Sequence, residues 1–437
     1  MRDTRRSPRL ALAGLTMATL HIIGAGLAGL AAAVEASRDR RWSAVRIYEA
    51  AGRAGGRCRS YHDERLDRLI DNGNHLMLSA NEATLAYLEE TGGRPTVHIV
   101  QPAEIPFLDL ETGERWSVRP TPGPLPLWLL AGSRRTAGAG FGAHVRAIRA
   151  ILGASEGTSV AEALRGTDER LFARFWDPMT RAVLNTRPEA ASARLLASFL
   201  STILRSGEAG MRPCIADGGL AAALVEPALG LLARRGVEIT FGARVRAIGL
   251  DGGRVFGFDI GRADPVMLES GDAVVLAVPP EIAGELLPEL QTPRESNPIL
   301  NLHFRLGSRP TLPGGLPFLG LIGGTAQWLF VRNDVLSVTI SVADDLVDRS
   351  AAEIAAPVWD DICRALGYDG EMPACRVIKE KRATFAQTDA ELARRPGPDI
   401  GLANLRLAGD WTDTSLPATI EGAIRSGIAA ARLAAPH

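Results

Sequence analysis

A glycine-rich turn near the start of the chain limits the possible folds more than any other feature. The short run His21-Ile22-Ile23 leads into Gly24-Ala25-Gly26-Leu27-Ala28-Gly29, which has the spacing GxGxxG. An Ala- and Leu-rich segment typical of a helix follows, and Val45-Arg46-Ile47-Tyr48 then alternates like a second strand that ends in Glu49. A strand, a tight turn, a helix and a strand within about 30 residues predict a dinucleotide-binding βαβ unit.

Each residue of this motif has a physical task in such a unit. Gly24 permits the sharp turn, Gly26 lets the backbone approach a pyrophosphate, and Gly29 allows the helix to pack closely on the strand. The helix N-terminus offers free N–H groups and the positive end of its dipole to the phosphates. Glu49 can accept hydrogen bonds from both ribose hydroxyls and disfavours a 2′-phosphate, so NADP is a poor candidate. A purely structural glycine turn is the alternative interpretation.

Composition excludes several classes of protein. The chain has 437 residues, which predicts two domains or more, and its net charge of −1 lacks the basic excess expected for a nucleic-acid partner. The four cysteines form no CxxC pair. They are typical of reduced thiols in a cytoplasmic protein, and they predict neither a disulfide framework nor a metal site.

The N-terminus allows more than one interpretation. Residues 2–9 contain four arginines, and residues 10–34 contain no charged side chain. The next charged residue is Glu35. By length this run could be a signal peptide or a membrane-spanning helix. Its Gly and Ala content and the glycine motif favour a strand and a buried helix instead. Met17 would be a natural first residue, so residues 1–16 are predicted to be a flexible extension.

A second glycine doublet distinguishes between the possible dinucleotides. Gly55-Gly56-Arg57 follows shortly after Glu49, and a nicotinamide-dependent dehydrogenase has no need of it. The arrangement resembles the FAD-binding amine oxidase and phytoene desaturase superfamily, in which the glycine pair and its arginine lie along the pyrophosphate. A solvated basic loop is the alternative.

The far end of the chain resembles the closing FAD motif of the same superfamily. Residues 405–432 read LRLAGDWTDTSLPATIEGAIRSGIAAAR, with a short strand before Gly409-Asp410 and a helix from about Ile420. The resemblance implies that Asp410 hydrogen-bonds the ribityl chain. It also implies that the backbone of Thr419 and Ile420 meets the pyrimidine end of the flavin. Alone, this segment could be a C-terminal helix docked on a sheet.

The stretch IDNGNHLML at 70–78 places a polar turn among aliphatic residues. In the superfamily, a similar turn lies against the flavin ring, so Gly73 is expected to touch the ring plane and His75 to face the substrate. Val245 matches the position that meets the adenine. The resemblance thus implies FAD binding by Gly24, Gly26, Leu27, Ala28, Gly29, Glu49, Ala50, Gly55, Gly56, Arg57, Asn72, Gly73, Asn74, His75, Val245, Gly409, Asp410, Thr419 and Ile420.

Stretches over most of the chain resemble the hydroxysqualene dehydroxylases, also described as squalene-associated FAD-dependent desaturases. They include DNGNHLML (71–78), PMTRAVLNTRPEAASARLL (178–196) and LAGDWTDTSLPATIEGAIRSG (407–427), of which the last is the most specific. Ser415 departs from the family, whose typical members have a glycine near this position, and residues 131–142 also diverge.

The resemblance implies reductive removal of the allylic hydroxyl of hydroxysqualene, giving squalene for squalene and hopanoid biosynthesis. Hydride from N5 of the reduced flavin would reach an allylic cation. An acid must protonate the leaving hydroxyl, and the candidates are Asp71, His75 and Glu421, with His75 preferred. An apolar lining is expected from 125–130 and 318–330. The alternatives are a desaturase or amine oxidase that works in the oxidative direction, and an FAD-bearing scaffold that holds isoprenoids without turnover.

The motifs lie at both ends and in the middle of the chain, which predicts a discontinuous domain. The expected fold is α/β, with a Rossmann-like FAD-binding domain of the glutathione-reductase/amine-oxidase type at 17–95, 215–280 and 375–437. A substrate-binding domain is expected at 96–214 and 281–374.

The implied partners follow from the substrate. We expect a hydrophobic triterpene, the synthases that form hydroxysqualene, and peripheral contact with the inner membrane. Trp128, in the proline-bracketed segment 122–130, is a candidate for that contact, with a core helix between the domains as the alternative.

Overall fold

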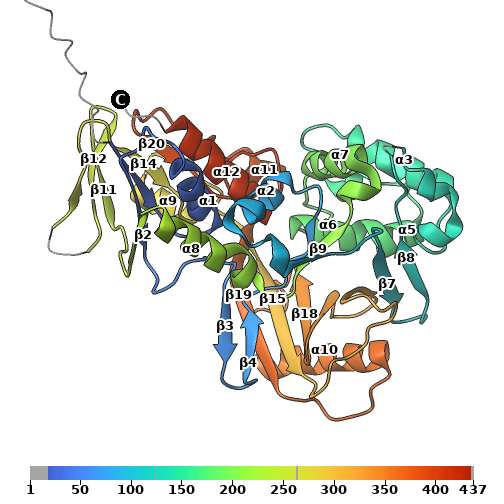
Figure 1. Cartoon of the computed structure of the whole chain (residues 1–437). Helices are drawn as coiled ribbons and strands as arrows, with labels where there is room; N and C mark the ends of the chain where they lie inside the picture. Colours follow the sequence, from blue (N-terminus) through green and yellow to red (C-terminus); the bar gives the residue numbers. More distant parts are fainter. Residues whose placement is uncertain (1–17, 124, 262–263, 435–437) are drawn as a thin grey trace, which may run out of the picture.

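The computed structural model describes residues 18–123, 125–261 and 264–434 (Figure 1), so the predicted extension at 1–16 lies outside the described residues. A five-stranded parallel sheet forms one side of the molecule, in the order β10-β2-β1-β14-β20. Its strands are β1 (Thr19–Ile23), β2 (Ala44–Glu49), β10 (Glu238–Phe241), β14 (Ala273–Leu276) and β20 (Leu405–Leu407). The predicted mixed α/β class is confirmed.

The two ends of the chain meet where helices cover this sheet. α1 (Leu27–Ala36) packs on α12 (Ile420–Leu433), and a Cβ on Gly427 of α12 would lie 2.0 Å from the carbonyl oxygen of Ala28. Only glycine therefore allows this close approach. Arg432 also donates to Glu35 at 2.8 Å.

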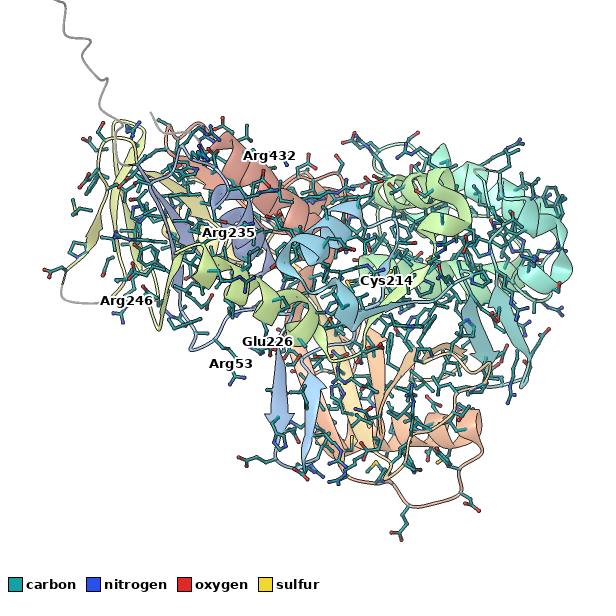
Figure 2. The ribbon with its side chains drawn as sticks, viewed as in Figure 1. Arg53, Cys214, Glu226, Arg235, Arg246 and Arg432 are labelled. Atoms are coloured by element: carbon teal, nitrogen blue, oxygen red, sulfur yellow. The ribbon has the colours of Figure 1, made fainter. Side chains whose placement is uncertain are left out.

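Arg235 follows α8 (Glu226–Arg234) and joins two further helices. Its guanidinium donates to the carbonyl of Val34 at 3.1 Å and to Glu90 of α2 (Glu82–Thr91) at 3.0 Å. Figure 2 labels Arg235 and Arg432 among the helices over the parallel sheet. The described part of the uncharged run, from residue 18 to residue 34, forms the strand β1 and most of the ten-residue helix α1. Among the described residues, no helix is long and apolar enough to cross a bilayer.

A seven-stranded sheet lies below the parallel sheet in Figure 1, in the order β19-β15-β18-β17-β16-β7-β8. Its strands are β7 (Ile105–Asp109), β8 (Arg115–Val118), β15 (Ser296–Arg305), β16 (Phe318–Ile322), β17 (Trp328–Arg332), β18 (Val335–Ser341) and β19 (Cys375–Phe385). All neighbours are antiparallel except β7 and β16.

Strand β15 shows how this sheet presents two different faces. Successive side chains of a strand alternate between faces. Leu300, Leu302 and Phe304 join the buried core that includes residues of α10 (Ala351–Leu366). Asn301 and Ile299 face the opposite way and line the central cavity. The sheet thus uses one face for its own core and the other for the site.

A helical layer closes the third side of the molecule, around a core that contains Trp176, Leu196 and Leu200. Its helices are α3 (Phe141–Leu152), α4 (Val160–Ala163), α5 (Glu169–Leu171), η4 (Phe172–Trp176), α6 (Asp177–Leu184) and α7 (Ala193–Gly210). The remaining elements named below are η2 (Leu127–Leu130), β4 (Arg68–Asp71), β11 (Ala247–Asp251), β12 (Arg254–Asp259) and β13 (Val266–Met267).

The strands of the parallel sheet come from the three chain segments expected for the FAD-binding domain. One strand differs from that expectation. β19 begins at Cys375, where the last predicted FAD segment starts, but it pairs with β15 of the seven-stranded sheet. The boundaries between the two domains stay a prediction.

Candidate active site

A cavity of about 1280 Å³ lies where the parallel sheet, the seven-stranded sheet and the helical layer meet. A site for one small molecule usually occupies about 300–1000 Å³. The cavity therefore has room for a dinucleotide and a second large ligand. Residues from the N-terminal glycine turn, the 72–76 turn, β15, β18 and the 409–420 segment all line it.

One wall of the cavity carries the N-terminus of α1. Gly26 is the N-cap of this helix and no side chain caps it, so the first N–H groups of the helix are left for a ligand. A Cβ on Gly26 would have no atom within 4 Å, whereas a Cβ on Gly29 would lie 1.9 Å from the carbonyl oxygen of Gly24. Gly26 is thus kept free on the cavity side, and Gly29, which does not line the cavity, serves packing.

The carboxylate of Glu49 is fixed at the edge of the same wall. Its two oxygens accept hydrogen bonds from the backbone N–H groups of Ala25 and Ala51, each at 2.7 Å. A carboxylate oxygen can accept more than one hydrogen bond, so both oxygens can still receive ligand hydroxyls. Ala50 and Val245 line the cavity beside Glu49.

An ion pair joins the two ends of the chain at the centre of the cavity wall. Arg57 Nη2 lies 2.6 Å from Asp410 Oδ1, and Arg57 Nη1 donates to the carbonyl of Ala383 at 2.6 Å. Asp410 raises the pKa of the Arg57 guanidinium, and burial opposes this effect. The pair fixes the position of Arg57 beside Gly55 and Gly56, which also line the cavity.

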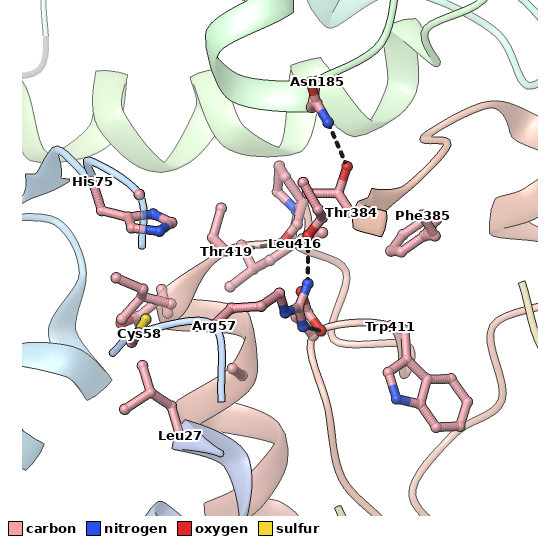
Figure 3. Close-up of a pocket in the computed structure, with 18 of the residues that line it drawn as sticks. Leu27, Arg57, Cys58, His75, Asn185, Thr384, Phe385, Trp411, Leu416 and Thr419 are labelled. Atoms are coloured by element: carbon pink, nitrogen blue, oxygen red, sulfur yellow. Dashed lines mark hydrogen bonds and ion pairs between the residues drawn. The ribbon is translucent and has the colours of Figure 1, made fainter. Parts of the chain in front are cut away.

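His75 projects into the cavity from the turn after β4. Figure 3 shows the imidazole and the Arg57 side chain extending into the same space, with Thr419 near both. Burial among protein atoms lowers the pKa of His75, while the nearby charge of Asp71 acts in the opposite direction. The imidazole is nevertheless accessible from the open cavity.

A polar cluster next to His75 joins the predicted residue Asn74 to Asn301 and Thr339, which the sequence analysis missed. Asn74 Nδ2 donates to Thr339 Oγ1 at 3.1 Å, and Thr339 Oγ1 donates to Asn301 Oδ1 at 2.9 Å. A Cβ on Gly73 would lie 3.3 Å from Asn301 Nδ2 and 3.6 Å from His75 Nε2, so both nitrogens border this glycine. The only signal in the sequence is a polar residue inside an apolar strand, as in PILNLHF.

The comparisons with known proteins agree with this geometry. The model of the flavin-containing amine oxidoreductase family matches residues 27–435. Hydroxysqualene dehydroxylase from Rhodopseudomonas palustris is 42% identical over 415 residues, which cover 95% of this chain and 98% of the relative. Hydroxysqualene dehydroxylase from Sinorhizobium fredii is 41% identical over 417 residues, which cover 95% of this chain and 98% of the relative.

The chain belongs to the hydroxysqualene dehydroxylase family, within the flavin-containing amine oxidoreductases.

A solved structure supports the fold. Cyclohexylamine oxidase from Brevibacterium oxydans IH-35A superimposes with a TM-score of 0.67, covers 95% of this chain and 98% of its own, and is 17% identical. Together with the family assignment, the cavity identifies the chain as an FAD-dependent oxidoreductase.

The residues of the cavity wall fit the FAD that this family implies. The uncapped start of α1 suits a pyrophosphate because its N–H groups and its dipole both favour negative charge. The open side of Gly26 gives that group room, and the fixed carboxylate of Glu49 suits a ribose diol. The individual FAD contacts stay predictions, although all the predicted FAD-binding residues except Gly29 line the cavity.

The closing segment of this dehydroxylase-family chain is held by a buried arginine. Arg395 donates to the carbonyls of Leu416 at 3.0 Å and of Thr412, and burial lowers its pKa. Thr419 then caps α12 by accepting from the N–H of Gly422 at 3.1 Å. Ser415 has φ +58°, which lies in the left-handed region that favours glycine.

The structure does not support two of the three predicted acids as proton donors. Asp71 does not line the cavity, because its carboxylate accepts from Arg332 at 2.5 Å and from the N–H of Leu220 at 3.0 Å. Glu421 borders the cavity, but its carboxylate accepts from the N–H and hydroxyl of Thr84 at 2.8 and 2.7 Å and from Arg425 at 2.6 Å. It therefore holds the start of α2 instead.

The apolar part of the cavity differs in detail from the expectation. From the two predicted stretches only Trp128, Leu129, Trp328 and Phe330 line it, because the others point into cores or toward the surface. The helical layer supplies further lining residues, which the sequence analysis did not name: Ile148, Phe175, Trp176, Met179, Ala182, Val183, Phe199, Leu200, Ile203 and Leu204.

Proposed function

We propose that the chain catalyses the reductive dehydroxylation of hydroxysqualene to squalene. The observation that carries this proposal is one cavity in which His75 stands between a dinucleotide-binding wall and a long apolar chamber. The names of the relatives, which are 38–42% identical, support the same substrate and the reductive direction.

The reaction replaces a carbon–oxygen bond with a carbon–hydrogen bond. The allylic hydroxyl takes up a proton and leaves as water with the electron pair of its bond, and a hydride then reaches the resulting carbocation. Bound FAD in its reduced form would supply that hydride, so one substrate molecule consumes two electrons. The residues of this chain must deliver the proton, orient the hydroxyl and keep other water away.

His75 is the residue that we propose as the proton donor. It lines the cavity without a hydrogen-bond partner among the described residues, whereas Asp71 lies outside the cavity and the carboxylate of Glu421 is bound by other protein groups. Its lowered pKa makes the protonated form a strong acid when it is present. Asn74, Asn301 and Thr339 hold one another in fixed positions beside it. We propose that Asn301 orients the leaving hydroxyl through its Nδ2 group.

The apolar chamber protects the carbocation. Water recaptures an allylic cation, so the reacting carbon must lie among groups that carry no nucleophile. Leu200, Ile203 and Phe330 are typical of this lining. A C30 hydrocarbon also gains favourable free energy from burial, at roughly 25 cal/mol for each Å² removed from water.

The proposal can be tested with the purified holoprotein under anaerobic conditions. Photoreduced protein is mixed with hydroxysqualene, the flavin absorbance is followed, and the organic extract is analysed. Flavin reoxidation together with formation of squalene is the expected result. Reduction of the oxidised protein by squalene or by an amine, without reaction of hydroxysqualene, would instead establish an oxidative enzyme and refute the proposal.

A further inference from the structure

A short helix in the cavity wall divides its apolar side chains between the cavity and the outside. In η2, Trp128 and Leu129 are 7% and 0% exposed and line the cavity. Leu127 and Leu130 are 57% and 62% exposed on the outer side. The predicted membrane residue Trp128 therefore does not lie on the surface, and its leucine neighbours do.

The elements on either side of η2 continue this outer surface. Leu125 is 65% exposed, and α3, which contacts η2, begins with the exposed Phe141. Arg135 bridges η2 and the start of α3 by donating to the carbonyls of Leu129 and Ala139. The resulting surface, called the apolar patch below, consists of Leu125, Leu127, Leu130 and Phe141.

The chain segment that carries the apolar patch is rich in arginine, and one of its arginines, Arg119, pairs with Glu104 at 2.7 Å. Residues 115–155 contain six arginines and no aspartate or glutamate, although the whole chain has a net charge of −1. Arg134, Arg146 and Arg149 are exposed. Within the part of the chain that the structure describes, none of these three arginines has an ion-pair partner. The patch is thus bordered by free cationic groups.

A second group of exposed apolar residues shows that exposed apolar side chains are not always accompanied by an excess of arginines in this protein. Leu250, Phe256 and Met267 on β11, β12 and β13 are also exposed. Their strands carry two carboxylates, Asp251 and Asp259, and one arginine, Arg254. An anionic surface would therefore attract these strands less than residues 115–155, which contain six arginines and no carboxylate.

We propose that the apolar patch and its arginines dock the protein on an anionic phospholipid bilayer. The leucines and Phe141 reach the acyl boundary, and the arginines meet the phosphates of the headgroups. η2 and α3 carry the patch on one side and Trp128, Leu129 and Ile148 of the cavity lining on the other. A substrate taken from the bilayer would therefore cross this wall to enter the cavity. This uptake of substrate rests on the proposed function, whereas binding of the protein to lipid does not.

A second copy of the chain fits this surface less well. A two-fold interface would bring the same arginines of both copies together, and residues 115–155 offer no carboxylate to pair with them. An anionic bilayer provides an apolar interior for the leucines and Phe141, and negatively charged headgroups for the arginines.

The test is co-sedimentation of the holoprotein with vesicles of phosphatidylcholine and phosphatidylglycerol. We expect the wild-type protein to bind, and binding to increase with the phosphatidylglycerol content. The triple variant Leu125→Glu, Leu127→Glu and Leu130→Glu should bind on the order of tenfold less, because a glutamate at each position is unfavourable in the apolar boundary of the bilayer. Arg146→Glu with Arg149→Glu should remove the dependence on phosphatidylglycerol. Full FAD content of each variant shows that it is folded.

The matched control is Phe256→Glu with Met267→Glu, which removes equally exposed apolar residues from the other surface. It should bind vesicles like the wild type. A wild-type protein that does not sediment, a triple variant that binds normally, or a dimer in solution that the triple variant dissociates would each overturn the proposal. Since none of these measurements needs hydroxysqualene, failure of the proposed reaction and failure of the docking surface are distinguishable.

Discussion

The wall of the cavity around the start of α1 and the wall around Asn301 differ in how their residues are arranged along the chain. The first wall is made by short motifs, in which residues close in sequence, such as Gly24 and Gly26, share one task. The second is made by single side chains from β15, β18 and the helical layer. The comparison teaches that short motifs can form one wall of a cavity through their backbone geometry, whereas the other wall needs side chains from distant elements.

The largest expected effect separates two glycines of the first wall. Gly26→Val has unstrained backbone and free space for its side chain, so the protein should fold. Its side chain would occupy the phosphate position, and FAD affinity should fall by more than about 100-fold, or about 3 kcal/mol. Flavin absorbance of the purified variant checks this. Gly29→Val is the contrasting variant, because its Cβ overlaps the carbonyl of Gly24, and it should not yield folded protein. A yellow, folded Gly26→Val protein would show that this wall does not hold the pyrophosphate.

His75, at the junction of the two walls, should affect turnover without affecting cofactor binding. His75→Ala should keep its FAD and lose on the order of 10²–10³ in kcat, because proton transfer is lost. The protonated imidazole is the active form, so wild-type kcat should decrease as the pH rises through the lowered pKa of His75, below 6.5. His75→Gln should abolish this pH dependence. Wild-type turnover by either variant would exclude the role.

His303 tests the pH response of the sheet that carries the second wall. Burial lowers its pKa from 6.5 to about 4, helped by the charge of Arg332 and opposed by that of Asp71. The pKa of His303 is lower in the folded protein than in the unfolded chain. Its contribution to the free energy of unfolding is therefore present above pH 6.5 and is lost as the pH falls toward 4. The expected loss is about 3 kcal/mol in the free energy of unfolding. Denaturant titrations at several pH values measure it. His303→Gln should remove this part of the pH dependence, and an unchanged slope would contradict the assignment.

Narrowing the apolar part of the cavity should lower kcat/KM for the substrate and leave FAD binding unchanged. Ala182 of α6 lines the cavity, and Ala182→Trp would fill part of it. We expect about a tenfold lower kcat/KM for a C30 substrate, since roughly one to two kcal/mol of burial is lost, and normal FAD content. A shorter C15 allylic alcohol should be less affected. Ala352→Trp, on the exposed start of α10, is the control that should change neither property.

The smallest expected effect lies in the closing segment of the cofactor side. Ser415 adopts φ +58°, where a residue with a Cβ is strained. Ser415→Gly should raise the free energy of unfolding by about 1 kcal/mol, because relief of the strain exceeds the added entropy of the unfolded chain. Thermal unfolding of the holoprotein measures it. A lower melting temperature would mean that the Ser198 Oγ bond to the carbonyl of Ser415, at 2.8 Å, depends on the serine.

The amino-acid sequence alone determined the parts of this protein that act through local geometry. The spacing of Gly24, Gly26 and Gly29 predicted β1, the turn and α1, because only a few conformations satisfy such glycines at a strand-to-helix junction. The resemblance of both chain ends to FAD motifs predicted that they meet, and the pair of Arg57 and Asp410 at 2.6 Å joins them.

Only the tertiary structure decided which polar side chains reach the cavity. Asp71, His75 and Glu421 were all acid candidates in the sequence, with His75 preferred, but the sequence did not show that Arg332 and Thr84 bind the two carboxylates. Asn301 and Thr339 lie 38 residues apart and come together because β15 and β18 pair in the register that places them opposite each other. The sequence likewise did not decide which side chains of η2 are buried, because all of its residues are apolar. Packing between distant parts of the chain fixes such choices, and a short stretch of sequence carries no information about that packing.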